Sequence, residues 1–271
     1  ENHPRYSTHV VAEERMRQNG AVLVLGSATP SIESFYNLNK NDKTITLAKR
    51  VNDQKMPVVR IVDLKKSYQM GDFSLLSNPL KDAIKIRLEK NQKTIILLNR
   101  RGYATQIVCQ KCGEVHTCNA CNLSYTYHKD KKFRCHRCFK EARVTNQCSH
   151  CKSNSLSFAG IGIQKVETEL KSLFPGQSIL RLDKDTAPSA KKMEKIITEF
   201  KKSGNILIGT QMIAKGHHIE AVTLVGVLGV DAVLNIPDFR SPERTFQLVT
   251  QVAGRAGRGA NVGEVIIQTF Q

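Results

Sequence analysis

A buried-strand pattern and a cysteine cluster adjoin each other in TIILLNRRGYATQIV, residues 94–108, and CQKCGEVHTCNACN, residues 109–122. The apolar run at 94–98 is typical of a strand buried on both faces of a parallel sheet, and a basic turn follows it. The next segment places four of the chain's eight cysteines in two C-x-x-C pairs. Such a cluster does not belong in the core of a sheet, so we interpret it as an insertion that begins where a central strand ends.

Short apolar strands alternate with amphipathic helices on both sides of this cluster. Strands are expected at residues 21–25, 56–64, 93–99, 178–183, 205–210, 221–231 and 263–270, and helices at 78–90, 162–174, 190–204 and 241–254. Ser and Thr residues around 27–34 are placed to cap a further short helix. This order predicts an α/β fold with a mostly parallel sheet covered by helices on both faces, interrupted by a cysteine block at about 105–155.

The charge balance indicates a polyanionic partner. The 271 residues include 41 Lys and Arg against 24 Asp and Glu, a formal net charge of +17. Nucleic acid is the first candidate, and an ordinary soluble surface is the alternative. The most apolar stretch, 221–234, is too short for a membrane span and contains Asp231, and the first residues lack the pattern of a signal peptide. We therefore expect no membrane association and a cytoplasmic, reducing compartment, where paired cysteines bind metal more often than they form disulfides. Because the sequence opens without Met, we also expect a fragment of a longer protein.

The eight cysteines form four C-x-x-C pairs, and each pair presents two sulfurs on one tight turn. Two pairs complete a tetrahedral zinc site, so four pairs predict two Zn²⁺ ions; a set of redox dithiols is the minor alternative. The predicted ligands are Cys109, Cys112, Cys118, Cys121, Cys135, Cys138, Cys148 and Cys151. With four protein ligands on each ion no position remains for water, which predicts structural rather than catalytic zinc.

Loop lengths bear on which pairs share an ion. Only five residues separate Cys112 from Cys118, whereas residues 122–134 form a ribbon-sized loop between Cys121 and Cys135. This favours a nested arrangement, in which the second pair joins the third and the first pair joins the fourth. Nesting also brings the ends of the insertion together, as an excursion from a sheet requires. A cross-braced arrangement with interleaved pairs is the alternative.

Histidines and cations accompany the cysteines. We expect the histidines at the surface or behind the ligands, because thiolates already fill both sites; they are His116, His128, His136 and His150. The cations form either a contact surface for DNA or protein or a solvated basic face; they are Lys111, Lys129, Lys131, Lys132, Arg134, Arg137 and Lys140.

Three motifs outside the cysteine block carry polar groups near expected element ends. GSATP (26–30) places amides and hydroxyls beyond a strand, where they would sense a phosphate or a metal-bound water network. GTQMIAKGHH (209–218) follows a strand, and open α/β sheets bind ligands at the carboxyl ends of strands. QVAGRAGR (251–258) ends a helix with two arginines, which suit a developing phosphoryl charge. Taken singly, each also fits a glycine turn, a strand–loop connection or a basic helix terminus.

The order GSATP, LLNRRG, cysteine block, GTQMIAKGHH and QVAGRAGR resembles that of the superfamily-two helicases. With its eight-cysteine insertion it is similar, over essentially the whole chain, to the PriA (primosomal protein N′) family of bacterial replication-restart helicases. The resemblance implies a RecA-like second motor lobe carrying a two-zinc insertion, and it favours the nested zinc pairing. It implies four parts: residues 1–50 as the tail of the first lobe, 51–104 as the start of the second, 105–155 as the zinc-binding insertion and 156–271 as the rest of the second lobe.

The resemblance also implies roles for individual residues. Gly26, Ser27, Ala28 and Thr29 match the motif that couples nucleotide state to DNA binding. Arg255 and Arg258, with Gln251 in the same motif, match the catalytic arginine side that reaches the γ-phosphate of ATP. The residues that match nucleic-acid contacts are Thr210, Gln211, Lys215, Arg100 and Arg101.

The function that the resemblance implies is an ATP-dependent 3′-to-5′ DNA helicase acting at stalled or abandoned replication forks and promoting primosome assembly and replication restart. Its implied partners are forks and single-stranded DNA, primosome proteins and single-strand-binding protein. Neither a G-x-x-x-x-G-K-[ST] phosphate loop nor a D-E-x-H motif occurs in the sequence. We expect both upstream, so ATP and Mg²⁺ belong to the full-length protein and this chain alone is inactive. Two alternatives remain: a non-catalytic zinc-dependent module that binds nucleic acid or primosome proteins, and a superfamily-two translocase that acts on RNA.

Overall fold

The computed structural model describes most of the chain, in two compact units, residues 1–44 and 45–271. The described residues are 6–41, 43–48, 55–98, 106–109, 111–127, 132–135, 137–143, 147–159, 162–214, 219, 221–234, 238–257 and 262–270. None of the helices among them is long and apolar enough to cross a membrane.

The first unit holds two helices, α1 (Thr8–Asn19) and α2 (Ile32–Lys40). The hydroxyl of Ser31 caps α2 by accepting a hydrogen bond from the amide of Ser34, as the sequence predicts. The strand expected at 21–25 is wrong for this structure: the segment has no regular secondary structure, and Val22 and Val24 are 88% and 85% exposed. A strand needs a neighbour to satisfy its backbone groups, and no strand is present in the described part of this unit.

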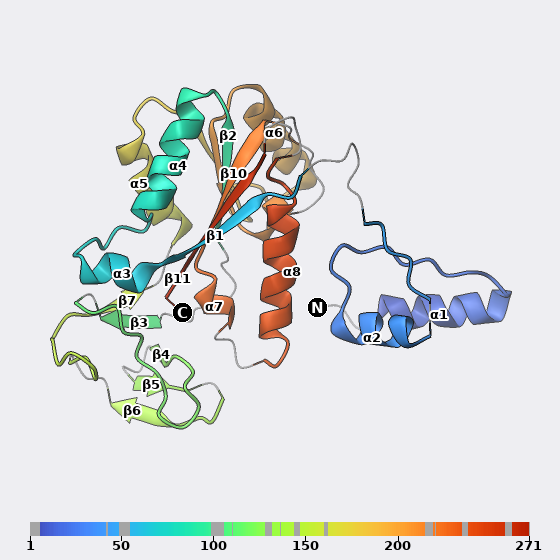
Figure 1. The fold of residues 1–271 in the computed structure, drawn as a ribbon, viewed down its shortest axis with the longest axis horizontal. Helices are drawn as coiled ribbons and strands as arrows, with labels where there is room; N and C mark the ends of the chain where they lie inside the picture. The colour runs from blue at the N-terminus through green and yellow to red at the C-terminus, as the bar shows by residue number, and fades with distance from the viewer. Residues whose placement is uncertain are drawn as a thin grey trace. The chain divides into compact units, whose positions relative to one another are not determined.

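The second unit is built on a six-stranded sheet in which all five pairings are parallel (Figure 1). Its strand order is β1-β11-β10-β2-β9-β8. The strands are β1 (Val58–Asp63), β2 (Lys93–Leu98), β8 (Ile179–Leu182), β9 (Ile206–Gly209), β10 (Val222–Leu228) and β11 (Glu264–Thr269). The predicted parallel α/β sheet is confirmed, and β2 lies inside it, between β10 and β9.

Two apolar cores, one on each face, hold the helices against this sheet. Alternate residues of β2 divide between them: Ile95 and Leu97 pack on the face covered by α6 (Ala190–Lys202) and α8 (Ser241–Ala253). Ile96 and Leu98 pack on the opposite face, under α4 (Asn78–Glu89) and α5 (Ile163–Leu173). The period of two along a strand thus explains why β2 is apolar at every position from Ile95 to Leu98. Three shorter helices, α3 (Leu64–Gln69), α7 (Asp231–Leu234) and the 3₁₀ turn η2 (Gln211–Ala214), were not predicted.

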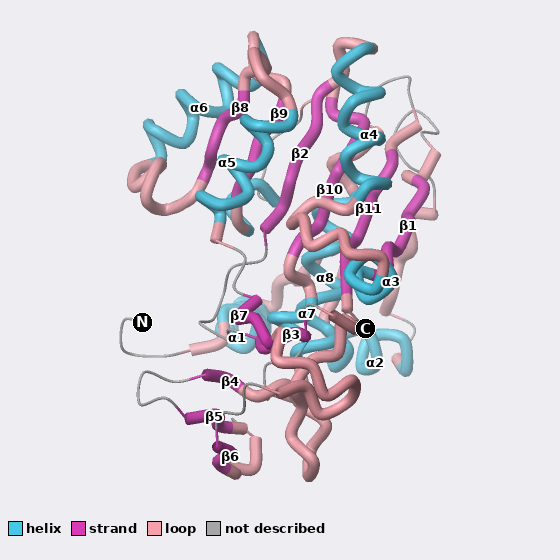
Figure 2. The backbone as a smooth tube through the Cα atoms, turned by 90° about the vertical axis from the view of Figure 1, so that its left-hand side faces the viewer, coloured by secondary structure: helices cyan, strands magenta, loops and turns pink. Residues whose placement is uncertain are grey.

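The cysteine block lies beyond the end of the sheet where β2 stops (Figure 2). Its first and last strands, β3 (Gln106–Cys109) and β7 (Leu156–Ala159), pair antiparallel and so bring the two ends of the insertion together. The strands β4 (Thr126–Tyr127), β5 (Lys132–Arg134) and β6 (Glu141–Arg143) form a second small antiparallel sheet. Among the described residues of the block, Ile107, Tyr125 and Phe133 form a buried core with the cysteines, so few of these residues provide apolar packing.

Candidate metal centres and other predicted site residues

The structure gathers the eight cysteines into two groups of four. One group is Cys109, Cys112, Cys148 and Cys151, the other Cys118, Cys121, Cys135 and Cys138, and within each the ligand atoms lie within 4.8 Å of one another. This is the nested arrangement, not the cross-braced one. We call the first group the outer tetrad and the second the inner tetrad.

All four C-x-x-C pairs fold into the same turn. Two hydrogen bonds of 2.8–3.1 Å define it. In the first pair, the Cys109 amide donates to the Glu114 carbonyl and the Gly113 amide donates to the Cys109 carbonyl. The other three pairs have the same two bonds at the same spacing. The residue after the second cysteine has a positive φ: 72° at Gly113, 54° at Asn122, 59° at Phe139 and 58° at Lys152. Glycine adopts this conformation freely and asparagine tolerates it, but it costs other residues about 1–2 kcal/mol. Two of the four turns are therefore strained.

Sulfur positions in both tetrads match a tetrahedral ion. Bonds of about 2.3 Å to zinc place tetrahedral sulfurs about 3.8 Å apart. The observed separations are 3.5 Å for Cys109–Cys151, 3.6 Å for Cys112–Cys148 and 3.6 Å for Cys118–Cys138. Both donor sets therefore fit a four-sulfur metal site.

Hydrogen bonds and burial give the thiols within each tetrad different pKa values. The backbone amide of Ala120 contributes most to lowering the pKa of Cys118 to about 6, whereas the neighbouring sulfur of Cys138 raises the pKa of Cys121 to about 12. In the outer tetrad Ser153 lowers the pKa of Cys151 to about 6, and burial raises the pKa of Cys112 to about 12. The hydrogen bonds to Cys118 and Cys151 thus favour their thiolate forms, and a bound divalent cation would favour the thiolate form of all four sulfurs in a tetrad.

Two polar residues that the sequence did not single out support the cysteines. The Ser153 hydroxyl lies 3.3 Å from the sulfurs of both Cys109 and Cys151. The Tyr125 hydroxyl donates to Cys118, and burial followed by that contact raises the pKa of Tyr125 to about 12. The position of Ser153, two residues after the last cysteine, was a signal available in the sequence.

No histidine of the described residues joins either tetrad. The half-buried His116 ring packs against Tyr125 and Phe133 at centroid distances of 5.4 and 5.1 Å, and burial lowers its pKa. His150 is exposed. His128 and His136 lie outside the described residues.

The outer tetrad adjoins the α/β unit through α3. A Cβ added to Gly113 would stand 2.8 Å from the Cα of Lys65, so the first cysteine turn approaches the α3 backbone as closely as only glycine allows. The Gln69 side chain donates to the Cys112 carbonyl at 3.5 Å. Val115 packs with Leu64 and Phe270, the latter just after β11. The insertion is thus in direct contact with the α/β part of the second unit.

The residues predicted to contact nucleic acid come directly after β2 and β9, which are neighbours in the sheet. Thr210 stands just after β9, and its amide donates to the carbonyl of Leu182 on β8 at 3.3 Å. Gln211 begins η2, and both side chains are half-buried. Lys215, Arg100 and Arg101 lie outside the described residues. The two described members of this predicted site, Thr210 and Gln211, thus lie at the carboxyl edge of the sheet.

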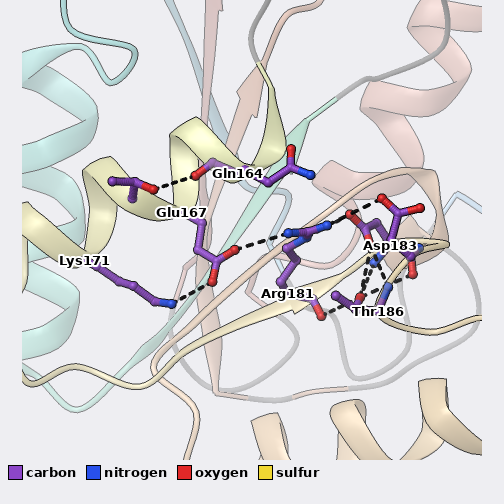
Figure 3. A network of polar contacts seen from close by, with 8 residues as sticks. Gln164, Glu167, Lys171, Arg181, Asp183 and Thr186 are labelled. Carbon is purple, nitrogen blue, oxygen red and sulfur yellow. Dashed lines mark hydrogen bonds and ion pairs between the residues drawn. The ribbon is translucent and has the colours of Figure 1, made fainter.

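A network missed by the sequence analysis fixes the loop at the same edge after β8 (Figure 3). Arg181 donates to Asp183 at 2.8 Å and lies 3.5 Å from Glu167 of α5. Asp183 accepts from the Thr186 amide at 2.9 Å, and the Thr186 hydroxyl donates to the Arg181 carbonyl at 3.0 Å. Burial raises the pKa of Asp183, but hydrogen bonds from Thr186 and Arg181 outweigh burial, and the net shift is downward.

Of the predicted nucleotide-site arginines, only Arg255 is among the described residues. It is half-buried in the turn after α8, where its amide donates to the Val252 carbonyl at 2.9 Å. Its side chain lines a small cavity with apolar residues that include Ile95, Leu207 and Val222. Gln251 is exposed on α8, and Arg258 lies outside the described residues.

The GSATP motif lies in the first unit. Ser27 accepts a hydrogen bond from the Thr29 amide at 3.1 Å, which closes a tight turn. Gly26, Ser27 and Ala28 are exposed, and Thr29 is half-buried. The polar groups of this turn are therefore largely available to a ligand.

Residues 148–260 match the helicase conserved C-terminal domain family. Over its whole length the chain is 42% identical to the replication restart protein PriA of Bacillus subtilis, of which it covers 34%. The proteins of that name from Synechocystis and Haemophilus influenzae are 37% and 39% identical over 98% of this chain, which covers 34% and 36% of them. The chain therefore spans about a third of the length of these relatives. Among solved structures, the chain is similar to Saccharomyces cerevisiae Dbp5 bound to RNA and ADP BeF3. The alignment covers 97% of this chain and 48% of the Dbp5 chain, with 15% sequence identity and a TM-score of 0.44.

Proposed function

The chain belongs to the PriA family of replication restart proteins, and on that premise we propose that it is the second motor lobe, with its zinc-binding insertion and the tail of the first lobe, of an ATP-dependent 3′-to-5′ DNA helicase. One observation carries the proposal: a parallel six-stranded lobe is interrupted, after the central strand β2, by an insertion with two four-cysteine groups. In the full-length protein this helicase would act at stalled or abandoned forks in the cytoplasm and promote primosome assembly and replication restart.

Both tetrads hold zinc in this proposal, and the ions are structural. All-sulfur donor sets with tetrahedral spacing select zinc over the hard cations Ca²⁺ and Mg²⁺. Bound zinc supplies fixed cross-links: it holds the four thiolates of a tetrad together and so folds a block with few apolar core residues. Ser153 and Tyr125 stabilise the thiolates, and Gly113 lets the outer turn approach α3.

Arg255 and Arg258 form the arginine side of the ATP site, and Gln251 of α8 belongs to the same motif. The turn that carries Arg255 is fixed at both ends, because Arg255 donates to Val252 and the Gly257 amide donates to the Val222 carbonyl at 3.0 Å. Gly26, Ser27, Ala28 and Thr29 couple the nucleotide state to DNA binding. ATP and Mg²⁺ are ligands of the full-length protein.

Single-stranded DNA crosses the carboxyl edge of the sheet, where Thr210 and Gln211 contact its backbone together with Lys215, Arg100 and Arg101. The position of Thr210 at the end of β9 supports this path, since open α/β sheets bind ligands there. Forks, primosome proteins and single-strand-binding protein are the partners of the full-length protein.

Arginine replacement in a full-length protein that carries this segment tests the motor role. We expect Arg258→Ala to lower DNA-stimulated ATP hydrolysis by roughly 10³-fold or more, the effect of trans-acting arginines in related phosphoryl transfers. Fork binding should stay within about twofold, since this arginine contacts nucleotide; Lys201→Ala, which removes one charge from α6, is the matched control. Unchanged hydrolysis would instead favour a non-catalytic zinc-dependent binding module, and equal loss of binding and hydrolysis would also contradict the proposed role.

We further propose that this 271-residue chain does not hydrolyse ATP alone, because its sequence contains no phosphate loop. A phosphate-release assay with single-stranded DNA should give the background rate. Turnover that disappears in Arg255→Ala would contradict this part of the proposal.

A further inference from the structure

Phe239 stands on the surface immediately before α8. It is 86% exposed. Isolated exposed apolar residues are common on folded proteins, so exposure alone assigns no role to it. Three further features distinguish Phe239 from other exposed apolar residues: its backbone is held in place, a cation lies beside the ring, and it follows a strand of the sheet.

Asp238 holds the backbone on both sides of Phe239. Its carbonyl accepts from the Ser241 amide at 2.9 Å, and its carboxylate accepts from the Arg240 amide at 2.9 Å. The same carboxylate pairs with the Arg244 guanidinium at 2.6 Å. The turn is therefore tied down at three points, and the ring projects from a rigid support.

Arg240 lies over the ring. Its guanidinium carbon is 5.2 Å from the ring centroid, within the range of a cation–π contact. Because Phe239 remains 86% exposed, the guanidinium leaves most of the ring open to solvent. A flat apolar surface beside a fixed positive charge matches a nucleotide, which offers a π-face and an anionic phosphate.

The turn also lies on the proposed path of DNA. Phe239 belongs to the connection that leaves the carboxyl end of β10, and β10 is the neighbour of β2 in the parallel sheet. The predicted contacts Arg100 and Thr210 follow β2 and β9, the next strands along the same edge. Figure 1 shows α7, the first part of this connection, beyond the carboxyl ends of the strands.

We propose that Phe239 is a stacking platform for one base of single-stranded DNA and that Arg240 orients it and attracts the adjacent phosphate. The inference deepens the proposed function and rests on it, because it assumes that DNA crosses this edge. It adds a contact that holds a base, whereas the other predicted contacts on this edge hold the backbone.

The test compares ordinary and abasic single-stranded oligonucleotides of equal length, end-labelled, by fluorescence anisotropy with the full 271-residue chain. Stacking of one base on an aromatic ring corresponds to roughly a fivefold change in affinity or more. We expect Phe239→Ala to weaken binding of the ordinary oligonucleotide by at least about fivefold and to leave binding of the abasic one unchanged. Phe239→Trp should keep or strengthen base-dependent binding.

The matched control is Phe246→Ala on α8, also an exposed phenylalanine at 66%, which should bind both oligonucleotides like the unchanged chain. Far-ultraviolet circular dichroism checks that each variant is folded. Equal weakening of both oligonucleotides by Phe239→Ala, or no weakening of either, would overturn the stacking platform while leaving DNA binding by the lobe intact. Failure of the unchanged chain to bind either oligonucleotide would overturn the DNA path itself and this inference with it.

Discussion

Gly113 of the first cysteine turn and Lys65 of α3 approach so closely that a Cβ on the glycine would lie 2.8 Å from the Cα of Lys65 and 3.1 Å from its Cβ. Real Cβ atoms do not come this near to backbone, so the contact between the insertion and the α/β unit depends on the missing side chain. The outer tetrad therefore has two tasks, to close the insertion and to hold it against α3.

Gly113→Ala should destabilise the chain through both conformation and contact. A positive φ costs alanine about 1–2 kcal/mol, and forcing the neighbouring backbone to move adds about 1–3 kcal/mol. Gly71→Ala is the matched control, because Gly71 ends the α3 region with φ 82° and nothing within 4 Å of its added Cβ. Urea unfolding of both variants should give a larger loss for Gly113→Ala, and equal losses would contradict the close contact.

Phe139→Gly should stabilise the cysteine block. Phe139 has φ 59° and is 79% exposed, so the substitution relieves backbone strain and removes little packing. Relief of the strain outweighs the added flexibility of the unfolded glycine chain by about 0.5–1 kcal/mol. Lys140→Gly, at the next position, where φ is not positive, should be destabilising. Thermal unfolding with saturating zinc separates the two, and destabilisation by Phe139→Gly would contradict the assigned strain.

Ser153→Ala should weaken metal binding at the outer tetrad only. Its hydroxyl lies 3.3 Å from two sulfurs, and loss of such supporting groups typically lowers metal affinity about 10–100-fold. Ser155→Ala, an exposed serine in the same segment, serves as the control. Competition with a chromophoric chelator should show one weakened and one unchanged site. Two unchanged sites would show that Ser153 plays no part in binding.

Asp183→Asn should reduce the acid sensitivity of the fold. Because the folded pKa of Asp183 is depressed, its contribution to stability is present above the unfolded pKa of about 3.9 and is lost as the pH falls through the folded pKa. The free energy of unfolding should therefore fall less steeply for the variant than for the unchanged chain below about pH 5. Taking the difference between the two proteins would cancel any acid release of metal, which both would share. Parallel curves would contradict the lowered pKa.

Local periodicity predicted the sheet because its inner strands β2, β9 and β10 are buried on both faces and bounded by polar turns. The alternation of Ile95 and Ile96 between two cores requires both faces to be covered, which an unbroken apolar run indicates. The short link between Cys112 and Cys118 and the longer loop between Cys121 and Cys135 favoured the nested pairing, which the structure has. Both features can be read from patterns and spacings along the chain.

The sequence analysis missed, or predicted wrongly, the features that depend on contacts between different elements. Residues 21–25 have the apolar pattern of a strand, but a strand forms only where a neighbour completes its hydrogen bonds. The contact between Gly113 and Lys65 joins residues far apart in sequence, and the ion pair between Arg181 and Glu167 joins β8 to α5. No local pattern encodes these pairs. The roles proposed for Arg255 and Thr210 rest on the family resemblance rather than on periodicity or spacing.

Metal analysis of the purified chain tests the central claim most directly, because two nested zinc sites would distinguish this chain from an uninterrupted α/β domain. We expect two zinc ions per folded chain, with X-ray absorption showing four sulfur ligands at about 2.3 Å around each. Cys118→Ser and Cys148→Ser should each retain one ion, and His150→Ala should retain both. A folded chain with no zinc, or zinc bound through nitrogen or oxygen, would contradict the account.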